Sequence, residues 1–180
     1  MKKTIVTFGL ISGAIMSLMM VVSLPFIDRV GFDRAEILGY TTIVLSFLLV
    51  YFGIRSYRDN AAGGTISFGR AFQVGILITL TSCVCYVVTW EILYFTVLHG
   101  FMERYAAYAM EQANASGASP ESIQAQLGQI NRMKELYRNP FFNVAITFIE
   151  PFPIGLIMTL ISAAILRKKP PSLLAPARIV

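Results

Sequence analysis

Two carboxylic acids, Glu91 and Glu150, lie inside long apolar runs of the chain, and the only other charge in these runs is Arg70, near the start of the run that contains Glu91. A carboxylate in hydrocarbon costs about 3 kcal/mol on insertion scales, so such residues usually face a protein interior and often mark function. Glu91 lies about 10 Å from the end of its run and Glu150 about 13 Å from the start of its own, at 1.5 Å per helical residue. Two antiparallel helices would hold both acids at similar depth. If they face each other, like-charge repulsion would keep at least one neutral near pH 7.

The pair is a candidate site for a shared proton or a cation, and the alternative, which we favour, is a packing role. In that alternative, each acid is protonated or bonded to a nearby hydroxyl. Pro151 and Pro153 follow Glu150 directly, so two backbone donors are missing and carbonyls near residues 147 and 149 are freed. A broken helix beside a carboxylate recurs in transporters. A simple packing kink is the alternative that we favour.

Metal and thiol candidates give weaker signals. His99 is the only histidine, and a zinc site with Glu91 and Glu150 would take two ligands from one helix, eight residues apart. A solvated imidazole at the interface is the preferred interpretation. Cys83 and Cys85 project about 200° apart on a helix, which suits neither an intrahelical disulfide nor a shared metal.

Enzymatic chemistry has little support in the sequence. Tyr86, Trp90 and Tyr94 are interpreted as packing or interfacial aromatic residues rather than a ligand cage. The chain has no Ser–His–acid set, no HExxH motif and no phosphate-binding loop. We therefore expect no catalytic activity, no cofactor and no bound metal.

The composition indicates a membrane protein. The 180 residues are 56% hydrophobic and only 14% charged, whereas soluble domains are about a quarter charged. Four apolar runs exceed the roughly 20 residues that cross about 30 Å of hydrocarbon. The first is too long for a signal-peptide core and lacks a small-x-small cleavage site, so we expect it to be retained. The predicted spans are residues 4–27, 36–57, 68–98 and 141–166.

These spans predict an all-α fold, an integral membrane four-helix transmembrane bundle. Residues 1–169 would form a single domain and residues 170–180 a disordered cytoplasmic tail. Gly9, Gly13 and Ser17 share one helical face at four-residue spacing, which permits close approach of a neighbouring helix. The same face is a candidate contact for self-association into a homo-oligomer.

The flanking charges predict the orientation. One set of flanks carries nine of the fifteen basic residues with a single acid, Asp59, and should be cytoplasmic. Both termini are then inside. The net charge of +5 follows this topology, so we expect no nucleic-acid binding. We expect the basic rim on that side to contact anionic lipid headgroups. The rim consists of Arg55, Arg58, Arg70, Arg167, Lys168 and Lys169.

Residues 99–140 form the one substantial segment outside the predicted spans. The turn-rich stretch NASGASP at residues 114–120 divides it. Ser119, Pro120 and Glu121 are typical of a helix start. Apolar residues then recur at helical spacing, at Ile123, Leu127, Ile130, Met133 and Tyr137. The segment therefore predicts an external amphipathic helical hairpin between the third and fourth spans. Ser67 is a predicted cap of the third span, after a flexible reversal at Gly63 and Gly64.

Several motifs together resemble a known family. They include LGYTTIVLSFLLVYFGIRSYRD at residues 38–59, GGTISFGRAFQVGILITL at 63–80 and FIEPFPIGLIMTLISAAILRKK at 148–169. YVVTWEI at 86–92 and FMERYAAY at 101–108 extend the resemblance over nearly the whole chain. The chain resembles the bacterial inner-membrane family catalogued as domain of unknown function 4199. The resemblance implies a bacterial inner-membrane location and four transmembrane helices, and it implies no activity.

Two classes of function remain. We favour a non-catalytic accessory, assembly or envelope-maintenance component, because the chain lacks internal repeats and catalytic motifs. The alternative is a small oligomeric proton- or cation-coupled transporter that uses Glu91 and Glu150. The missing repeat weakens this alternative, since many transporters are built from inverted repeats.

Overall fold

The computed structural model describes residues 1–168, and these residues are almost entirely helical. Four helical stretches are long and apolar enough to cross a membrane, which confirms the prediction of an all-α fold with four candidate spans. They are α1 (Lys2–Ser23), α3 (Phe32–Ala61), α4 (Phe68–Thr96) and the pair α7 (Pro140–Ile149) and α8 (Pro151–Leu166). The predicted tail, residues 170–180, lies outside the described residues.

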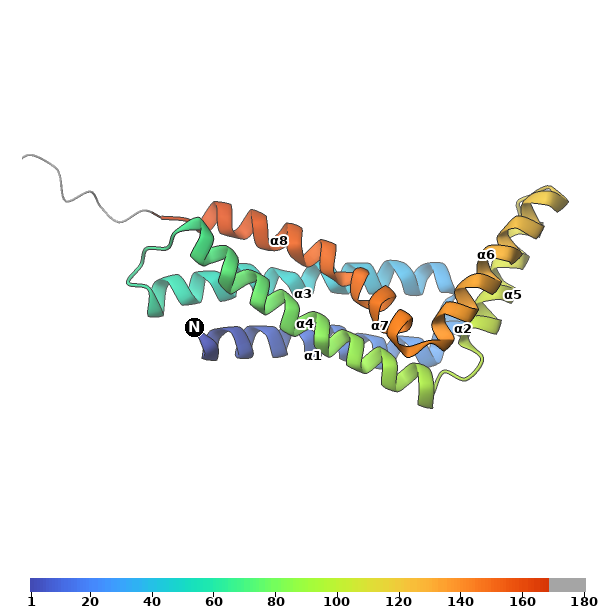
Figure 1. Ribbon diagram of the computed structural model, residues 1–180, viewed down its shortest axis with the longest axis horizontal. Helices are drawn as coiled ribbons and strands as arrows, with labels where there is room; N and C mark the ends of the chain where they lie inside the picture. The colour runs from blue at the N-terminus through green and yellow to red at the C-terminus, as the bar shows by residue number, and fades with distance from the viewer. Residues whose placement is uncertain (169–180) are drawn as a thin grey trace, which may run out of the picture.

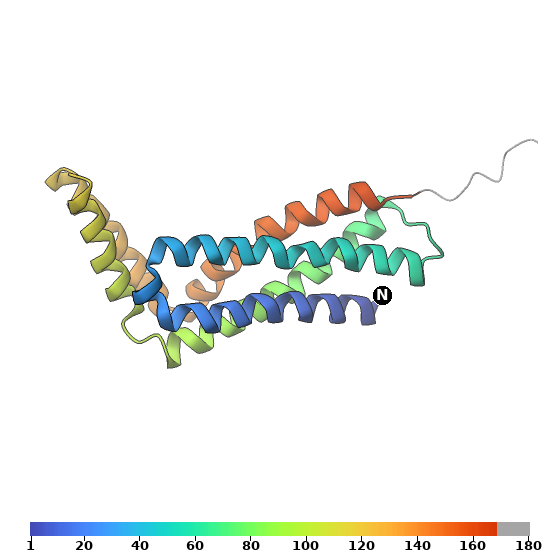
Figure 2. The ribbon, with the colours of Figure 1, turned by 180° about the vertical axis from the view of Figure 1, so that it is seen from behind.

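The long helices form one elongated bundle with two different ends (Figure 1). The N-terminus, the α3–α4 connection and the end of α8 lie together at what we call the termini end (Figures 1 and 2). Helices α5 (Phe101–Ala115) and α6 (Pro120–Arg138) lie side by side at the opposite end, the hairpin end. A 3-10 turn, η1 (Leu24–Phe26), and the short α2 (Ile27–Val30) connect α1 to α3 there.

Local signals set the helix boundaries. The Ser67 hydroxyl accepts a hydrogen bond from the Arg70 amide at 3.3 Å, and the Ser119 hydroxyl accepts one from the Ser122 amide at 3.2 Å. Both predicted caps are confirmed. Gly31, with φ 85°, precedes α3, so this helix begins four residues before the predicted start of the second span. Helix α1 ends at Ser23, before the predicted residue 27, because the chain tightens into η1.

The termini end is fixed by packing and by backbone pairing. Phe47, Val50 and Ile54 of α3 are fully buried against α4 and α8. Ile66 and Lys168 exchange both backbone hydrogen bonds, at 3.0 and 2.9 Å. The connection before α4 is therefore attached to the end of α8.

Small residues let α1 approach α4 closely. A Cβ atom on Gly9 would lie 2.6 Å from the Thr81 Cβ, and one on Gly13 would lie 2.6 Å from the Cys85 Cβ. The Ser17 hydroxyl accepts a hydrogen bond from the Thr89 hydroxyl at 2.8 Å. The predicted small-residue face thus contacts a neighbouring helix of the same chain, and α4 covers it. A second copy of the chain would have to contact another surface.

Buried hydroxyls of α1, α4 and α8 form hydrogen bonds to neighbouring helices. Ser12 of α1 donates to the Ser46 carbonyl of α3 at 3.0 Å, and Ser82 of α4 donates to the Gly9 carbonyl at 3.1 Å. The hydroxyls of Thr79 and Thr159 lie 3.0 Å apart between α4 and α8. Interhelical hydrogen bonds of this kind stabilise membrane helix pairs by about 1 kcal/mol.

A pair of glycine substitutions tests the α1–α4 contact. Gly13→Ala should destabilise the protein by about 1–3 kcal/mol, because the added methyl group overlaps Cys85. Gly128→Ala is the matched control, since Gly128 lies in α6 with open space around it, and it should be neutral or stabilising by up to about 1 kcal/mol. Unfolding in mild detergent measures both. Equal stability of the two variants would contradict the close approach of α1 to α4.

Candidate functional site

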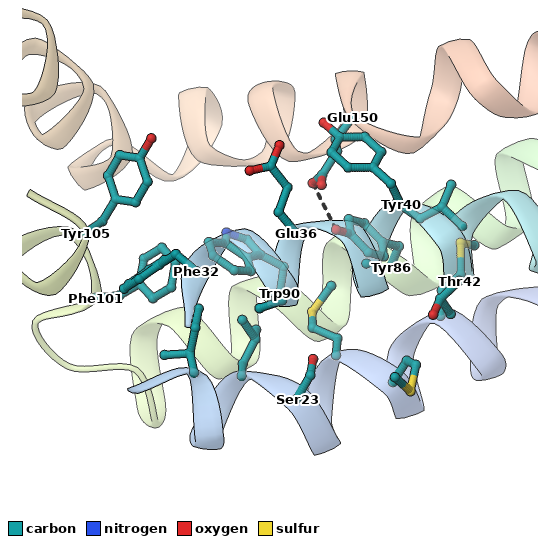
Figure 3. Close-up of a pocket in the computed structure, with 18 of the residues that line it drawn as sticks. Ser23, Phe32, Glu36, Tyr40, Thr42, Tyr86, Trp90, Phe101, Tyr105 and Glu150 are labelled. Carbon is teal, nitrogen blue, oxygen red and sulfur yellow. Dashed lines mark hydrogen bonds between the residues drawn. The ribbon is translucent and has the colours of Figure 1, made fainter. Parts of the chain in front are cut away.

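A cavity of about 390 Å³ lies at the hairpin end of the bundle (Figure 3). Its lining comes from α1, η1, α2, α3, α4 and the α7–α8 junction, with α5 and α6 contributing from the hairpin. Most of the lining is apolar or aromatic. The seven aromatic residues are Phe32, Tyr40, Tyr86, Trp90, Phe101, Tyr105 and Tyr137.

The cavity exists because α3 is tightly packed at one end and open at the other. A Cβ atom on Gly53 would lie only 2.5 Å from the Ile78 side chain, whereas Gly39, on the same helix, has nothing within 4 Å. None of residues 32–42 is buried, and burial on α3 begins at Ile43. The first turns of α3 therefore form one wall of the cavity instead of entering the core.

Glu150 lines the cavity at the point where the fourth span breaks. Its carboxylate accepts a hydrogen bond from the Tyr86 hydroxyl at 2.9 Å (Figure 3). Pro151 begins α8 and is fully buried, and Pro153 is exposed on the same helix. Neither proline is among the described residues that line the cavity, and neither are Thr147 and Ile149. The break brings the Glu150 side chain to the cavity. The backbone carbonyls that the prolines free, near residues 147 and 149, are not part of the cavity lining.

Glu36 of α3 is the second carboxylic acid of the cavity. Its carboxyl lies next to that of Glu150 in the view of Figure 3, and the two are close enough to interact electrostatically. Sequence reasoning missed Glu36 because it stands at the edge of an apolar run, where a charge is unremarkable. Glu36 and Tyr40 are four residues apart and therefore share one face of the helix, and this spacing was the signal in the sequence that could have pointed to Glu36.

Glu91 does not line this cavity. It follows Trp90, which does, and one helical residue rotates the side-chain direction by about 100°. The Glu91 Oε1 atom is buried and has no hydrogen-bond partner among the described residues. The structure therefore places Glu150 with Glu36 in the cavity and leaves Glu91 on another face of α4.

A fully buried amide, Asn143 of α7, fixes the ring of Trp90. The Trp90 Nε1–H donates to the Asn143 Oδ1 at 2.7 Å, and the Thr147 hydroxyl donates to the same oxygen at 3.2 Å. The Asn143 Nδ2 donates to the Tyr137 carbonyl at 3.4 Å, so one side chain connects α4, α7 and α6. Sequence reasoning missed Asn143 because it searched the fourth span for charges, although an amide in an apolar run is also a signal.

Aromatic contacts hold the hairpin against the bundle. Phe32, at the start of α3, packs against Phe101 and Tyr105 of α5, with ring centroids 5.9 and 5.6 Å apart. The Lys134 Nζ of α6 lies 2.5 Å from the Glu103 Oε1 of α5, and this contact lowers the pKa of Glu103. Phe101 and Tyr105 line the cavity, so the position of the hairpin determines its shape.

The phenol of Tyr137, also in the lining, is neutral at physiological pH. Burial raises its pKa to about 12, with a further contribution from the Glu150 carboxylate. Tyr86 and Trp90, which sequence reasoning assigned to packing, both line the cavity, while Tyr94 stacks on Trp90 with ring centroids 5.6 Å apart. The aromatic residues thus divide between packing and the cavity wall.

No group of three or more His, Cys, Asp or Glu side chains is arranged for a metal ion within residues 1–168. His99 is exposed in the connection after α4, and it does not line the cavity. Cys83 is buried in the core and Cys85 packs against Gly13. The arrangement at the hairpin end suits non-covalent binding through carboxylates and aromatic rings.

Removal of the Asn143 amide tests the structure of the cavity wall. Asn143→Ala leaves the Trp90 Nε1–H without its acceptor, so we expect a loss of about 1–3 kcal/mol in stability and a shifted Trp90 emission spectrum. Trp90 is the only tryptophan, so its fluorescence reports this site alone. Asn131→Ala, at an exposed position of α6, is the control and should change neither quantity. An unchanged spectrum in Asn143→Ala would contradict the described contact.

A family model matches most of the chain. A model of the family described as "Protein of unknown function (DUF4199)" matches residues 7–168, which is nearly the whole chain. No curated protein and no solved structure matches. The family resemblance stated from the motifs is therefore confirmed, and the chain belongs to the DUF4199 family.

Proposed function

We propose that this protein is a non-catalytic membrane protein that binds a ligand in the hairpin-end cavity, as an accessory or envelope-maintenance component of the bacterial inner membrane. The observation that carries the proposal is the cavity itself. It has a volume of about 390 Å³, within the range of about 300–1,000 Å³ for small-molecule sites, and combines apolar walls with two carboxyls.

The packing of the termini end favours a binding site over a conducting pathway. A solute leaving the cavity in that direction would meet Phe47, Val50 and Ile54, which are fully buried. Gly75 and Gly155 bring α4 and α8 into close contact at the same level, where an added Cβ atom would overlap neighbouring side chains. Passage would therefore require the helices to separate.

Proton- or cation-coupled transport is the second candidate. Glu150 favours it, because this carboxyl lies at a proline break and faces a cavity. The transport hypothesis from the sequence used Glu91 together with Glu150, and Glu91 lies outside the cavity. A transporter would therefore use Glu150 with Glu36.

Two measurements separate binding from transport. Bromodecane, which is uncharged, should quench Trp90 saturably in wild type and in the control Gly69→Phe, because Gly69 lies in α4 with open space around it and outside the cavity lining. Quenching should be at least about tenfold weaker in Gly39→Phe, which fills the cavity from a position with open space around it. Proteoliposomes under a pH gradient should show no proton flux above empty liposomes. A flux abolished by Glu150→Gln would establish the transport alternative, and quenching that Gly39→Phe leaves intact would refute binding in the cavity.

We also propose that the termini end is cytoplasmic and the hairpin external. The support is the distribution of basic residues, since Arg55, Arg58 and Arg70 all lie at the termini end. The bilayer would surround the exposed apolar side chains, and the basic rim would contact anionic headgroups. Self-association into a homo-oligomer remains part of the proposal, through a surface other than the covered Gly9–Gly13 face.

Cysteine labelling in intact cells tests this orientation. Ser116→Cys, in the hairpin turn, should react with a membrane-impermeant maleimide added from outside. Asn60→Cys, exposed near the end of α3, should react only after the inner membrane is permeabilised. The unmodified chain, whose two cysteines lie within α4, gives the background. The reverse pattern would invert the topology.

A further inference from the structure

We infer that the hairpin-end cavity takes an amphiphile with an ammonium group on a flexible apolar chain. The inference rests on the proposed binding function and adds the chemical class of the ligand. Its basis is the combination of charge, aromatic surface and methionine lining at one place in the fold.

The charged side chains that line the cavity are all acidic. Glu36 and Glu150 are the charged residues in the lining, and within the described chain no Lys, Arg or His lines it. The two carboxyls lie next to each other in the view of Figure 3 and interact electrostatically, with Glu150 half-buried and Glu36 exposed. A positive group between them would relieve their repulsion, whereas an anionic headgroup would add to it.

The hydrogen-bonding capacity of Glu150 is only partly used. A carboxylate has about four acceptor positions, and Tyr86 supplies one donor within the described structure. An ammonium group carries three N–H donors and no acceptor, so it matches acceptor-only partners. The Trp90 N–H is already bonded to Asn143 and Tyr94 stacks on the ring, so Trp90 offers a cation only the part of its aromatic surface that lines the cavity.

The rest of the lining suits a flexible chain. Five methionines border the cavity, and this unbranched, polarizable side chain adapts to ligands of variable shape. They are Met16, Met19, Met20, Met102 and Met133. A small metal ion would leave this surface unused, and it would need about six oxygen ligands where two carboxyls are present.

Three ligands with one chain and different headgroups test the inference. ω-Bromodecylammonium, ω-bromodecanol and ω-bromodecanoate carry the same quencher, and Trp90 is the only tryptophan. We expect the ammonium compound to quench Trp90 with a Kd at least about tenfold lower than that of the alcohol, and the carboxylate to bind most weakly. Equal Kd values for the three would overturn the ligand class and leave cavity binding intact. Quenching that Gly39→Phe does not weaken would overturn cavity binding as well.

Matched glutamate variants locate the selectivity. Glu36→Gln and Glu150→Gln should each remove most of the preference for ammonium over alcohol while the alcohol still binds. Glu91→Gln, on another face of α4, should retain the preference. Glu36 is exposed, so its replacement is expected to leave folding intact even if Glu150→Gln does not fold. A preference that survives Glu36→Gln and Glu150→Gln, or that Glu91→Gln abolishes, would contradict the inference.

Two kinds of molecule carry an ammonium group on an apolar chain: a soluble alkylammonium compound, and a lipid with an ethanolamine headgroup. Nanodiscs containing brominated-chain phosphatidylethanolamine or phosphatidylglycerol distinguish these sources. Stronger Trp90 quenching by the ethanolamine lipid, lost in Glu36→Gln, identifies the lipid. Equal quenching by both lipids, together with selective binding of ω-bromodecylammonium, identifies a soluble amphiphile. Stronger quenching by phosphatidylglycerol, lost in Gly39→Phe, would overturn the inference.

Discussion

Close approach of helices at glycine residues sets the geometry of the whole bundle. Between the middle of the bundle and its termini end, Gly53 faces Ile78 and Gly155 faces Phe47, with no space for even one more methyl group. At the hairpin end the facing residues are large, among them Tyr40, Tyr86 and Trp90. Straight helices that touch at small residues at one end must separate where the side chains are large. The cavity is the consequence of this size gradient along the bundle.

A bundle that opens at one end needs further contacts there. Phe32 attaches α5 to the start of α3 through aromatic packing, and Asn143 joins α4, α6 and α7 through one buried amide. Buried polar atoms in an apolar region are unfavourable unless they are bonded, so this network favours one arrangement over its alternatives. The hairpin is therefore part of the cavity wall as well as a connection between spans.

Much of this architecture could be read from the sequence because it depends on local patterns. Run length predicts the spans, and Ser67 and Ser119 begin helices through contacts within one turn. The site could not be predicted in the same way. Whether Glu91 or Glu36 lies beside Glu150 in the cavity depends on the rotation of α4 about its axis and on the lateral position of α3. Tertiary packing fixes both. Glu91 satisfied every sequence criterion for a buried acid and still lies on another face of its helix.

Glu150 shows why packing and function need not be alternatives for a carboxyl in a span. Its bond from Tyr86 joins α4 to the α7–α8 junction, which is a structural role. The same carboxylate borders a cavity and keeps further acceptor positions, since one phenol satisfies only part of its capacity. The proline break makes both roles possible, because it lets the chain change direction at this residue. An acid that the fold already holds in place needs little reorganisation to meet a cation, and a fixed partner of that kind is what selective binding requires.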